Sequence, residues 1–399
     1  MRNLRALIAC ALGVLLVGSA LGAADGDDSG VMARIAKLES DMKKVNDARG
    51  GGGGLGANQL PFIIDGFIDV TGNYAFNRSP SRTNLLRHYD SAADTFTLNV
   101  AHLAFHRDST KASIVGFNVE IDMGEDARHD NGAKQPSGST ELFDVQEATI
   151  DLTIPGDENC GLVVGKFTTF EGIELIENTA NPVISRGFLF MFAEPLTHVG
   201  FYARYSKDVN GKGLMFNVKL GAVNGWDLEA DNNADKTFIW LLGVAQKGQF
   251  DVHFTGTWGD EQTATGGTTG HKAGNPRTSL DLTGFFVLDM LTLNFQVNGG
   301  QEKNAIATAK NVHWFGFALE PVVDFKNQLP GFKLGARFEL FNDVDGARMN
   351  GLGTNEPQCL YNVTIAPAYT IRDTTLTIRG EYRYDASNLN RGQNARAFE

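Results

Sequence analysis

Residues 332–340 read FKLGARFEL, and their side chains alternate in polarity along the chain. The apolar positions are Phe332, Leu334, Ala336, Phe338 and Leu340. The charged positions between them are Lys333, Arg337 and Glu339. Successive side chains of a β-strand point to opposite faces of its sheet. The stretch therefore predicts a strand with one apolar face and one strongly polar face.

The same alternation recurs along most of the chain. It is clear in FNVEIDM (117–123), LMFNVKLGA (214–222), FDVHFTGTW (250–258) and LTIRGEYRYD (376–385). About fifteen candidate strands can be counted, and many exceed the five or six residues that are usual in globular proteins. A soluble sandwich would also alternate. The number and length of the strands favour an all-β fold, an antiparallel up-and-down transmembrane β-barrel of about 16 strands over residues 60–399.

The connections between these strands alternate between long and short. We expect long ones near 77–94, 124–140, 170–196, 224–236, 259–277, 299–310 and 342–357. Short ones are expected near 107–111, 155–159, 206–212, 246–249, 289–290 and 371–374, and 320–330 is longer than the other members of this class. Long outer loops and short periplasmic turns are typical of outer-membrane barrels.

The N-terminus predicts export. Arg2 and Arg5 precede an apolar run, and the small residues ALGAA stand before Asp25. Residues 1–24 therefore read as a secretory signal peptide. Beyond it, no stretch approaches the roughly 20 apolar residues of a spanning helix. The predicted location is the bacterial outer membrane.

Residues 29–48 predict a short coiled-coil helix in the periplasm. Its a/d seam consists of Val31, Ile35, Leu38, Met42 and Val45. Such a short helix is marginal alone, so it either joins copies of the chain, for example in a homotrimer, or packs on its own barrel. A glycine-rich linker follows at 49–59.

Two segments carry a resemblance to a known family. SRGFLFMFAEPLTHVGFYARY (185–205) and RGEYRYDASNLN (379–390) resemble motifs of the β-barrel porin family with OmpL-like members. The matching positions are Arg186, Phe188, Pro195 and His198 in the first segment, and Glu381, Tyr382, Arg383, Asp385, Ser387 and Asn388 in the second. The resemblance covers roughly 60–399 and implies an outer-membrane diffusion pore without catalytic residues.

The predicted barrel lacks a recognisable closing strand. Such barrels have an even number of strands, and they normally end in a strand with a terminal aromatic residue. No apolar alternation follows Tyr384, and Phe398 is penultimate. Either one strand escapes detection, or the last strand is missing.

The third outer loop, about 170–196, is the candidate functional segment. In sixteen-stranded general porins the corresponding loop folds into the lumen. Here it carries Glu171, Glu174 and Glu177, which we expect to form the acidic side of a constriction. Candidate basic wall residues are Lys166, Arg204, Lys219, Lys333, Arg337, Arg379 and Arg383. Alternatively, the apolar part of the loop packs on the wall and its acids face solvent.

Composition and motifs argue against other functions. The net charge of −12 is unfavourable for nucleic-acid binding. The sequence contains no G-x-S-x-G, H-E-x-x-H or phosphate-loop motif and no Cys/His cluster with zinc spacing. We therefore expect no enzyme, cofactor or metal site. Cys160 and Cys359 are either a disulfide or two buried small residues.

The sequence thus favours a passive pore for small hydrophilic solutes or ions, embedded in outer-membrane lipid. Two alternatives stay open. One is a plugged structural or adhesive barrel whose periplasmic helix anchors the envelope. The other is a secreted soluble β-protein that binds glycans. The sequence does not identify the transported solute or the preferred sign of its charge.

Overall fold

The fold is described from a computed structural model. The structure describes residues 62–76, 82–84, 86–111, 113–134, 141–261, 274–305, 310–349 and 356–388. The predicted signal peptide (1–24), coiled-coil seam (Val31 to Val45), and linker (49–59) lie outside the described residues. The described residues all lie within 60–399, the range predicted for the barrel.

Within the described residues, sixteen strands form one sheet. They are β1 (Ile63–Gly72), β2 (Phe96–Arg107), β3 (Val115–Met123), β4 (Phe143–Ile154), β5 (Asp157–Thr168), β6 (Thr197–Asp208), β7 (Leu214–Val223), β8 (Thr237–Gln246), β9 (Phe250–Asp260), β10 (Pro276–Leu288), β11 (Leu291–Ala305), β12 (Lys310–Asp324), β13 (Phe332–Asp343), β14 (Gln358–Thr370), β15 (Thr377–Arg379) and β16 (Tyr382–Ser387). The helices are α3 (Glu125–Lys134), the 3-10 turn η3 (Asn178–Ala180) and α4 (Phe188–Phe192).

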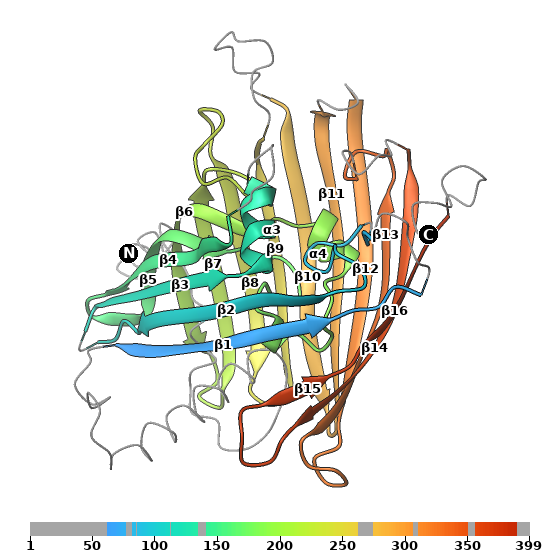
Figure 1. The fold of residues 1–399 in the computed structure, drawn as a ribbon. Helices are drawn as coiled ribbons and strands as arrows, with labels where there is room; N and C mark the ends of the chain where they lie inside the picture. The colour runs from blue at the N-terminus through green and yellow to red at the C-terminus, as the bar shows by residue number, and fades with distance from the viewer. Residues whose placement is uncertain are drawn as a thin grey trace.

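The sheet is an antiparallel meander, as predicted. From β1 to β14 each strand pairs with the next one in the chain, and the sheet curves round on itself (Figure 1). β15 pairs with Ala368–Thr370 of β14, and β16 pairs with Leu360–Ile365. The two short strands therefore lie along the same edge of β14. Together they correspond to the single last strand that the alternation at 376–385 predicted.

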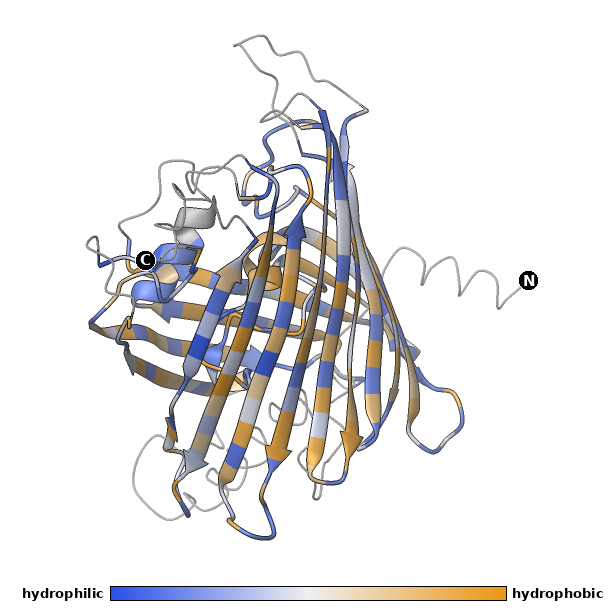
Figure 2. Cartoon of the chain, turned by 90° about the vertical axis from the view of Figure 1, so that its right-hand side faces the viewer, coloured by the Kyte–Doolittle hydropathy of each residue, from blue (hydrophilic) through white to orange (hydrophobic). Residues whose placement is uncertain are grey.

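The two faces of the sheet differ in polarity. On β14, Tyr361, Val363 and Ile365 are 43%, 42% and 48% exposed, whereas Asn362 and Thr364 between them are buried. Apolar and polar residues alternate in this way along the strands in Figure 2. An exposed apolar outer face suits contact with lipid hydrocarbon, and a polar inner face suits a lumen.

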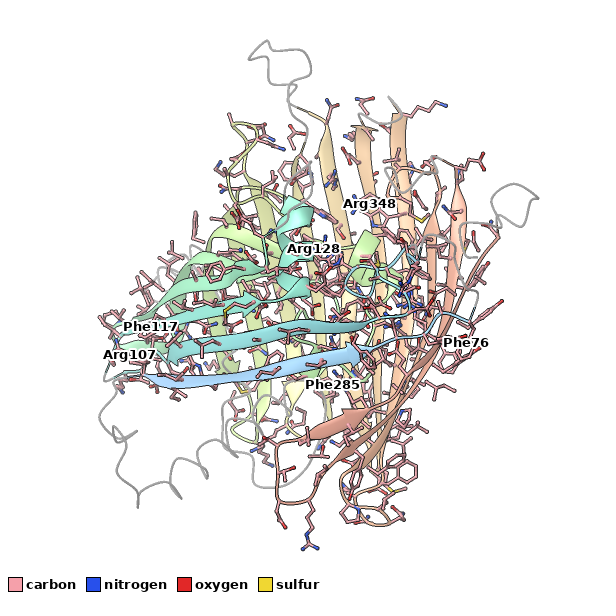
Figure 3. All side chains as sticks on the ribbon, viewed as in Figure 1. Phe76, Arg107, Phe117, Arg128, Phe285 and Arg348 are labelled. Carbon is pink, nitrogen blue, oxygen red and sulfur yellow. The ribbon has the colours of Figure 1, made fainter. Side chains whose placement is uncertain are left out.

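The edges of the sheet approach each other through side chains. Among the described residues, no β-ladder joins β1 to β15 or β16. Instead, Phe76 beyond β1 lies 6.2 Å from Tyr382 of β16, measured between ring centroids (Figure 3). Asp69 of β1 lies 4.0 Å from Arg379 of β15. The sequence left open whether one strand had escaped detection or the last strand is missing, and within the described residues β15 and β16 are the last strands and neither pairs with β1.

Most connections have the predicted lengths. The connection between β5 and β6, residues 169–196, is the long one expected near 170–196. Two predicted connections begin too early: residues 320–324 still belong to β12, and residues 299–305, expected in a long connection, continue β11 to Ala305. The polar sequence GGQEKNA hides this extension because its side chains lack the apolar alternation of a membrane-spanning strand.

The two cysteines are not bonded to each other. Cys359 on β14 is a free cysteine, and Cys160 on β5 is buried. Among the described residues, no helix has both the length and the apolar character needed to cross a membrane.

Candidate functional site

The segment between β5 and β6, residues 169–196, is called L3 here. It is enclosed by the curved sheet, and its helix α4 contacts β12 and β13 (Figure 1). Its sequence has neither the alternation of a strand nor room for a long helix between Pro182 and Pro195. L3 therefore folds as the turn η3 and the five-residue helix α4, joined by irregular backbone.

The wall supplies hydrogen-bond acceptors for backbone N–H groups of L3. Phe188 and Leu189, at the start of α4, donate to the Glu339 carboxylate at 2.8 and 2.7 Å. The first N–H groups of a helix have no partner within it. Glu339 on β13 satisfies two of them and thereby fixes α4 to the wall.

Glu174 makes the predicted contact between an acid of L3 and a basic wall residue. Arg337 Nη1 on β13 donates to the Glu174 carboxylate at 2.5 Å and to the Ser185 carbonyl at 2.6 Å. Glu174 also accepts from the Gly187 N–H at 2.5 Å. Arg337 is fully buried. This pair therefore ties two parts of L3 to β13, and it leaves no water-filled gap between acid and base.

The interruption between β15 and β16 also holds L3. Glu381, at the break, accepts from the backbone N–H groups of Ile184 and Ser185 at 2.5 and 3.0 Å. Arg383 donates to the Ser185 hydroxyl at 3.0 Å. Arg379 donates to the Asn178 carbonyl at 2.9 Å. Arg379, Glu381 and Arg383, all within the segment 379–390 that carries the family resemblance, thus contact L3.

The structure does not place Glu171 opposite a basic residue. Its carboxylate accepts from the Ser279 hydroxyl of β10 at 2.5 Å. The neighbouring wall carboxylate, Asp281, accepts from the Gly172 N–H at 2.7 Å. Burial, with Asp281 close by, raises the pKa of Glu171 to about 8. The expectation of facing charges is wrong here, because sequence spacing did not reveal which strands this part of L3 would meet.

Glu177 likewise meets polar and acidic wall residues, and no described lysine or arginine pairs with it. Gln146 Nε2 of β4 donates to its carboxylate. Burial, with Glu147 of the wall nearby, raises the pKa of Glu177. The three predicted acids of L3 therefore contact three different parts of the barrel.

The remaining predicted basic residues do not form one wall. Lys166 lies 3.2 Å from Asp144 and 2.9 Å from Glu229. Arg204 lies 2.9 Å from Asp151. These ion pairs neutralise both cations within the barrel.

Lys219 and Lys333 differ from these two. The Lys219 ammonium faces the ring of Phe170, 4.3 Å from its centroid. Lys333 lies 3.1 Å from Asp324, near the short connection between β12 and β13. Of the seven predicted wall residues, Arg337, Arg379 and Arg383 donate hydrogen bonds to L3.

The family-motif positions have structural partners. Arg186 donates to the carbonyls of Leu175 and Ile184 within L3 at 2.8 and 3.0 Å. His198 on β6 is buried and lies 3.1 Å from the Gly225 carbonyl. Pro195 is buried at the end of L3.

Asp385 joins a second loop to the end of the barrel. It pairs with Arg383 at 2.8 Å and with Arg87 at 3.0 Å. Arg87 belongs to the connection between β1 and β2, so this carboxylate links the first connection to β16.

The apolar half of L3 packs on the wall, as one alternative predicted. Phe188, Leu189 and Phe192 of α4 form a buried cluster with Trp314, Phe341, Leu360 and other apolar residues. Arg348 covers this cluster, and its guanidinium lies 4.8 Å from the Trp314 ring centroid (Figure 3). Both alternatives for L3 are thus partly right: the helix packs on the wall, and Glu174 meets a basic residue.

Several important residues were not singled out by sequence reasoning. Glu339 and Asp281 of the wall accept hydrogen bonds from backbone N–H groups of L3. Glu194 of L3 accepts one from the side-chain amide of Gln296 on β11, at 2.6 Å. The alternation put Glu339 and Asp281 on the polar face, which was the available signal. In the described segments, no group of three His, Cys, Asp or Glu side chains is placed to hold a metal ion.

Comparison with known proteins agrees with this architecture. Residues 61–397 match the family described as "Putative beta-barrel porin-2, OmpL-like". The chain belongs to this porin family. Its location is accordingly the bacterial outer membrane. None of the curated proteins matches the sequence closely enough to count as a relative.

Solved structures share the fold of this porin-family chain. The outer membrane channel DcaP of Acinetobacter baumannii is 12% identical, with a TM-score of 0.50 over 81% of this chain and 90% of that one. A loop L8 deletion mutant of OmpT, an outer membrane protein of Vibrio cholerae, is 13% identical, with a TM-score of 0.46 over 83% and 95% of the two chains. At these identities the likeness extends to the fold alone, and the second TM-score is too low to support an argument.

Proposed function

We propose that the protein is a passive diffusion pore for small hydrophilic solutes across the bacterial outer membrane, with L3 as its constriction. The observation that carries the proposal is the attachment of L3 to the inner face of the barrel. Carboxylates of β10, β13 and the β15–β16 break bind its backbone N–H groups. A loop held on several sides narrows a lumen without needing a hinge.

The inner face of the sheet is polar, which suits the lining of an aqueous path. Many of its buried side chains are polar or charged, and they include Asp122, Asn217, Thr255, Gln296 and Asn362. Such groups need hydrogen-bond partners, and most of them find these within the protein: Asp122 bonds to His102, and Asn362 accepts from Arg337. Selectivity would then come from the width and charge of the remaining path.

The mechanism is diffusion down a concentration gradient. No residue needs to change its covalent state, so we infer a transport role rather than a catalytic one. Glu177, an acid of L3 beside β4, would favour the passage of cations. The arginines near Ser185 are already bonded to L3 and paired with Asp385. Small polar solutes or ions are the partners.

The experiment is single-channel recording of the refolded mature chain in a planar bilayer under asymmetric salt. Stable current steps would support the pore, and the reversal potential would give the sign of its selectivity. A variant with residues 176–185 replaced by a short Gly/Ser linker should conduct more, because this part of L3 carries the contacts to Glu381 and Arg379. Equal conductance in both proteins would contradict the constriction.

The second candidate, a plugged structural barrel, is favoured by the apolar cluster of α4 with Trp314 and Phe341. Large apolar side chains inside a barrel exclude water from the volume they fill. Confirmed membrane insertion without current would favour this candidate. Its periplasmic helix would then act as an envelope anchor.

A homotrimer is the proposed assembly for either candidate. The proposal rests on the heptad spacing of Val31, Ile35, Leu38, Met42 and Val45. Chemical crosslinking in membranes, compared with a chain that starts at residue 60, tests it. Loss of the crosslinked trimer on truncation is expected.

A further inference from the structure

We propose that Glu120, Glu147 and Glu177 form a binding site for the primary ammonium group of small organic cations inside the barrel. The proposal deepens the proposed pore function, because it names the class of solute that this site would attract. It starts from a place where acids of the wall and of L3 meet each other.

Two of these carboxylates are direct neighbours in the sheet. Glu120 of β3 lies opposite Glu147 of β4 in the strand register. Asn118 Nδ2 donates to both carboxylates, at 2.7 and 2.8 Å. Like charges directly opposite each other destabilise a sheet. One shared amide group provides hydrogen bonds but no positive charge.

A β-bulge concentrates polar groups at this point. The register shifts between the pairs Glu120–Glu147 and Ile121–Val145, so Gln146 is the extra residue of β4. A bulge re-aims side chains that would otherwise alternate. Gln146 and Glu147 both bond to groups at the L3 side of the wall: Gln146 to Glu177, and Glu147 to Thr168.

L3 adds the third carboxylate. Glu177 accepts from Gln146 Nε2, so its side chain lies beside the bulge. The other charged groups that face the site are Asp122, His102 and Lys219. His102 is engaged by Asp122 at 2.7 Å, and the Lys219 ammonium faces the Phe170 ring. No described Lys or Arg forms an ion pair with any of the three glutamates within 4.0 Å.

Unused acceptors point to a ligand that brings N–H donors. Gln146 is fully buried, and its Oε1 accepts a hydrogen bond from no described residue. Asn118 donates to Oε1 of Glu120, not to Oε2. A primary ammonium group carries one positive charge and three N–H donors. Glu120, Glu147 and Glu177 are each partly exposed to solvent.

The test compares two cations of the same charge. n-Butylammonium has three N–H donors, whereas tetramethylammonium has none. Their binding to the refolded full chain in detergent micelles is measured by saturation-transfer NMR, which does not require conductance. We expect n-butylammonium to bind at least about tenfold more tightly, as one or two charge-assisted hydrogen bonds predict.

Variants assign the effect to the site. Glu120→Gln and Glu147→Gln each remove one charge and relieve the like-charge pair, so both proteins should fold. Each should weaken n-butylammonium binding by about tenfold or more. Glu158→Gln is the matched control, because Glu158 is an exposed acid on β5 outside the cluster. It should leave binding unchanged.

The outcomes separate this inference from the pore itself. Equal affinity for the two cations, or unchanged binding in both glutamine variants, would overturn the ammonium site even if the barrel conducts. Absence of current, with the preference for n-butylammonium intact, would overturn the pore and leave the site standing. In a conducting pore, added n-butylammonium should reduce the potassium current more strongly than tetramethylammonium does.

Discussion

Glu174 of L3 and Arg337 of β13 form a hydrogen-bonded ion pair of 2.5 Å in which the side chains are only 5% and 0% exposed. Their positions differ by more than 160 residues in sequence, yet the pair fixes where L3 lies in the barrel. A buried ion pair of this kind adds little stability compared with apolar residues in the same place. Removing only one of its partners, however, is strongly destabilising. This asymmetry makes it a sharp probe of L3.

Arg337→Met should destabilise the folded barrel by about 3–5 kcal/mol, because it leaves the Glu174 carboxylate buried without its partner. The measurement is equilibrium urea unfolding in lipid vesicles. The double variant Glu174→Leu/Arg337→Met should recover much of the loss. Arg372→Met, in an ion pair that is about 90% exposed, is the control and should change little. A double variant no more stable than Arg337→Met would contradict the assigned role of the pair.

Gly335→Ala should displace L3 from β13. A Cβ at Gly335 would lie 2.5 Å from the Pro182 carbonyl oxygen of L3, a backbone atom that cannot yield without moving the loop. We expect a loss of about 1–3 kcal/mol from overpacking and a changed single-channel conductance. Gly299→Ala on β11 is the matched control, since a Cβ there would lie 3.9 Å from its nearest neighbour, the Trp314 carbonyl oxygen. Identical conductance in both variants would argue against contact between L3 and β13.

The stability of the barrel should depend on pH through Glu171. Its pKa is raised from the ordinary value of 4.5 to about 8 in the folded chain, so the folded state holds a proton that the unfolded state releases. Stability should therefore fall as the pH rises from about 4.5 to about 8, and this contribution should level off above that.

Glu171→Gln should flatten this part of the pH profile, measured as the urea midpoint at several pH values. Glu158→Gln, at an exposed position, should leave the profile unchanged. A wild-type midpoint that rises between pH 5 and pH 8, or an unaltered slope in Glu171→Gln, would be inconsistent with a buried protonated Glu171.

Phe317→Arg tests which face of the sheet meets lipid. Phe317 is an outward, 44% exposed residue of β12, whereas Leu329 is a 50% exposed residue of the connection that follows it. An arginine in the middle of a lipid-facing strand costs about 2–4 kcal/mol. Leu329→Arg should cost far less, because the connection lies outside the hydrocarbon. Similar urea midpoints for the two variants in vesicles would contradict a lipid-facing outer surface.

The sequence predicted much of the barrel because its strands face two different solvents. The alternation at 332–340 put Lys333, Arg337 and Glu339 on one face, and all three lie on the inner side of β13. Loop length likewise identified 170–196 as the long connection between β5 and β6. The prediction failed at 299–305, where β11 extends beyond the apolar pattern on which strand recognition depends.

The partners of the L3 acids could not be predicted in the same way. Sequence alone identified Glu171, Glu174 and Glu177 as acids on an infolded loop, but only Glu174 meets an arginine. Alternation and loop length are local properties of the chain, and they determine strands, faces and connections. The contacts of L3 depend on how the whole sheet curves and where the irregular loop backbone finds acceptors. That is a long-range property, and only the tertiary structure decides it.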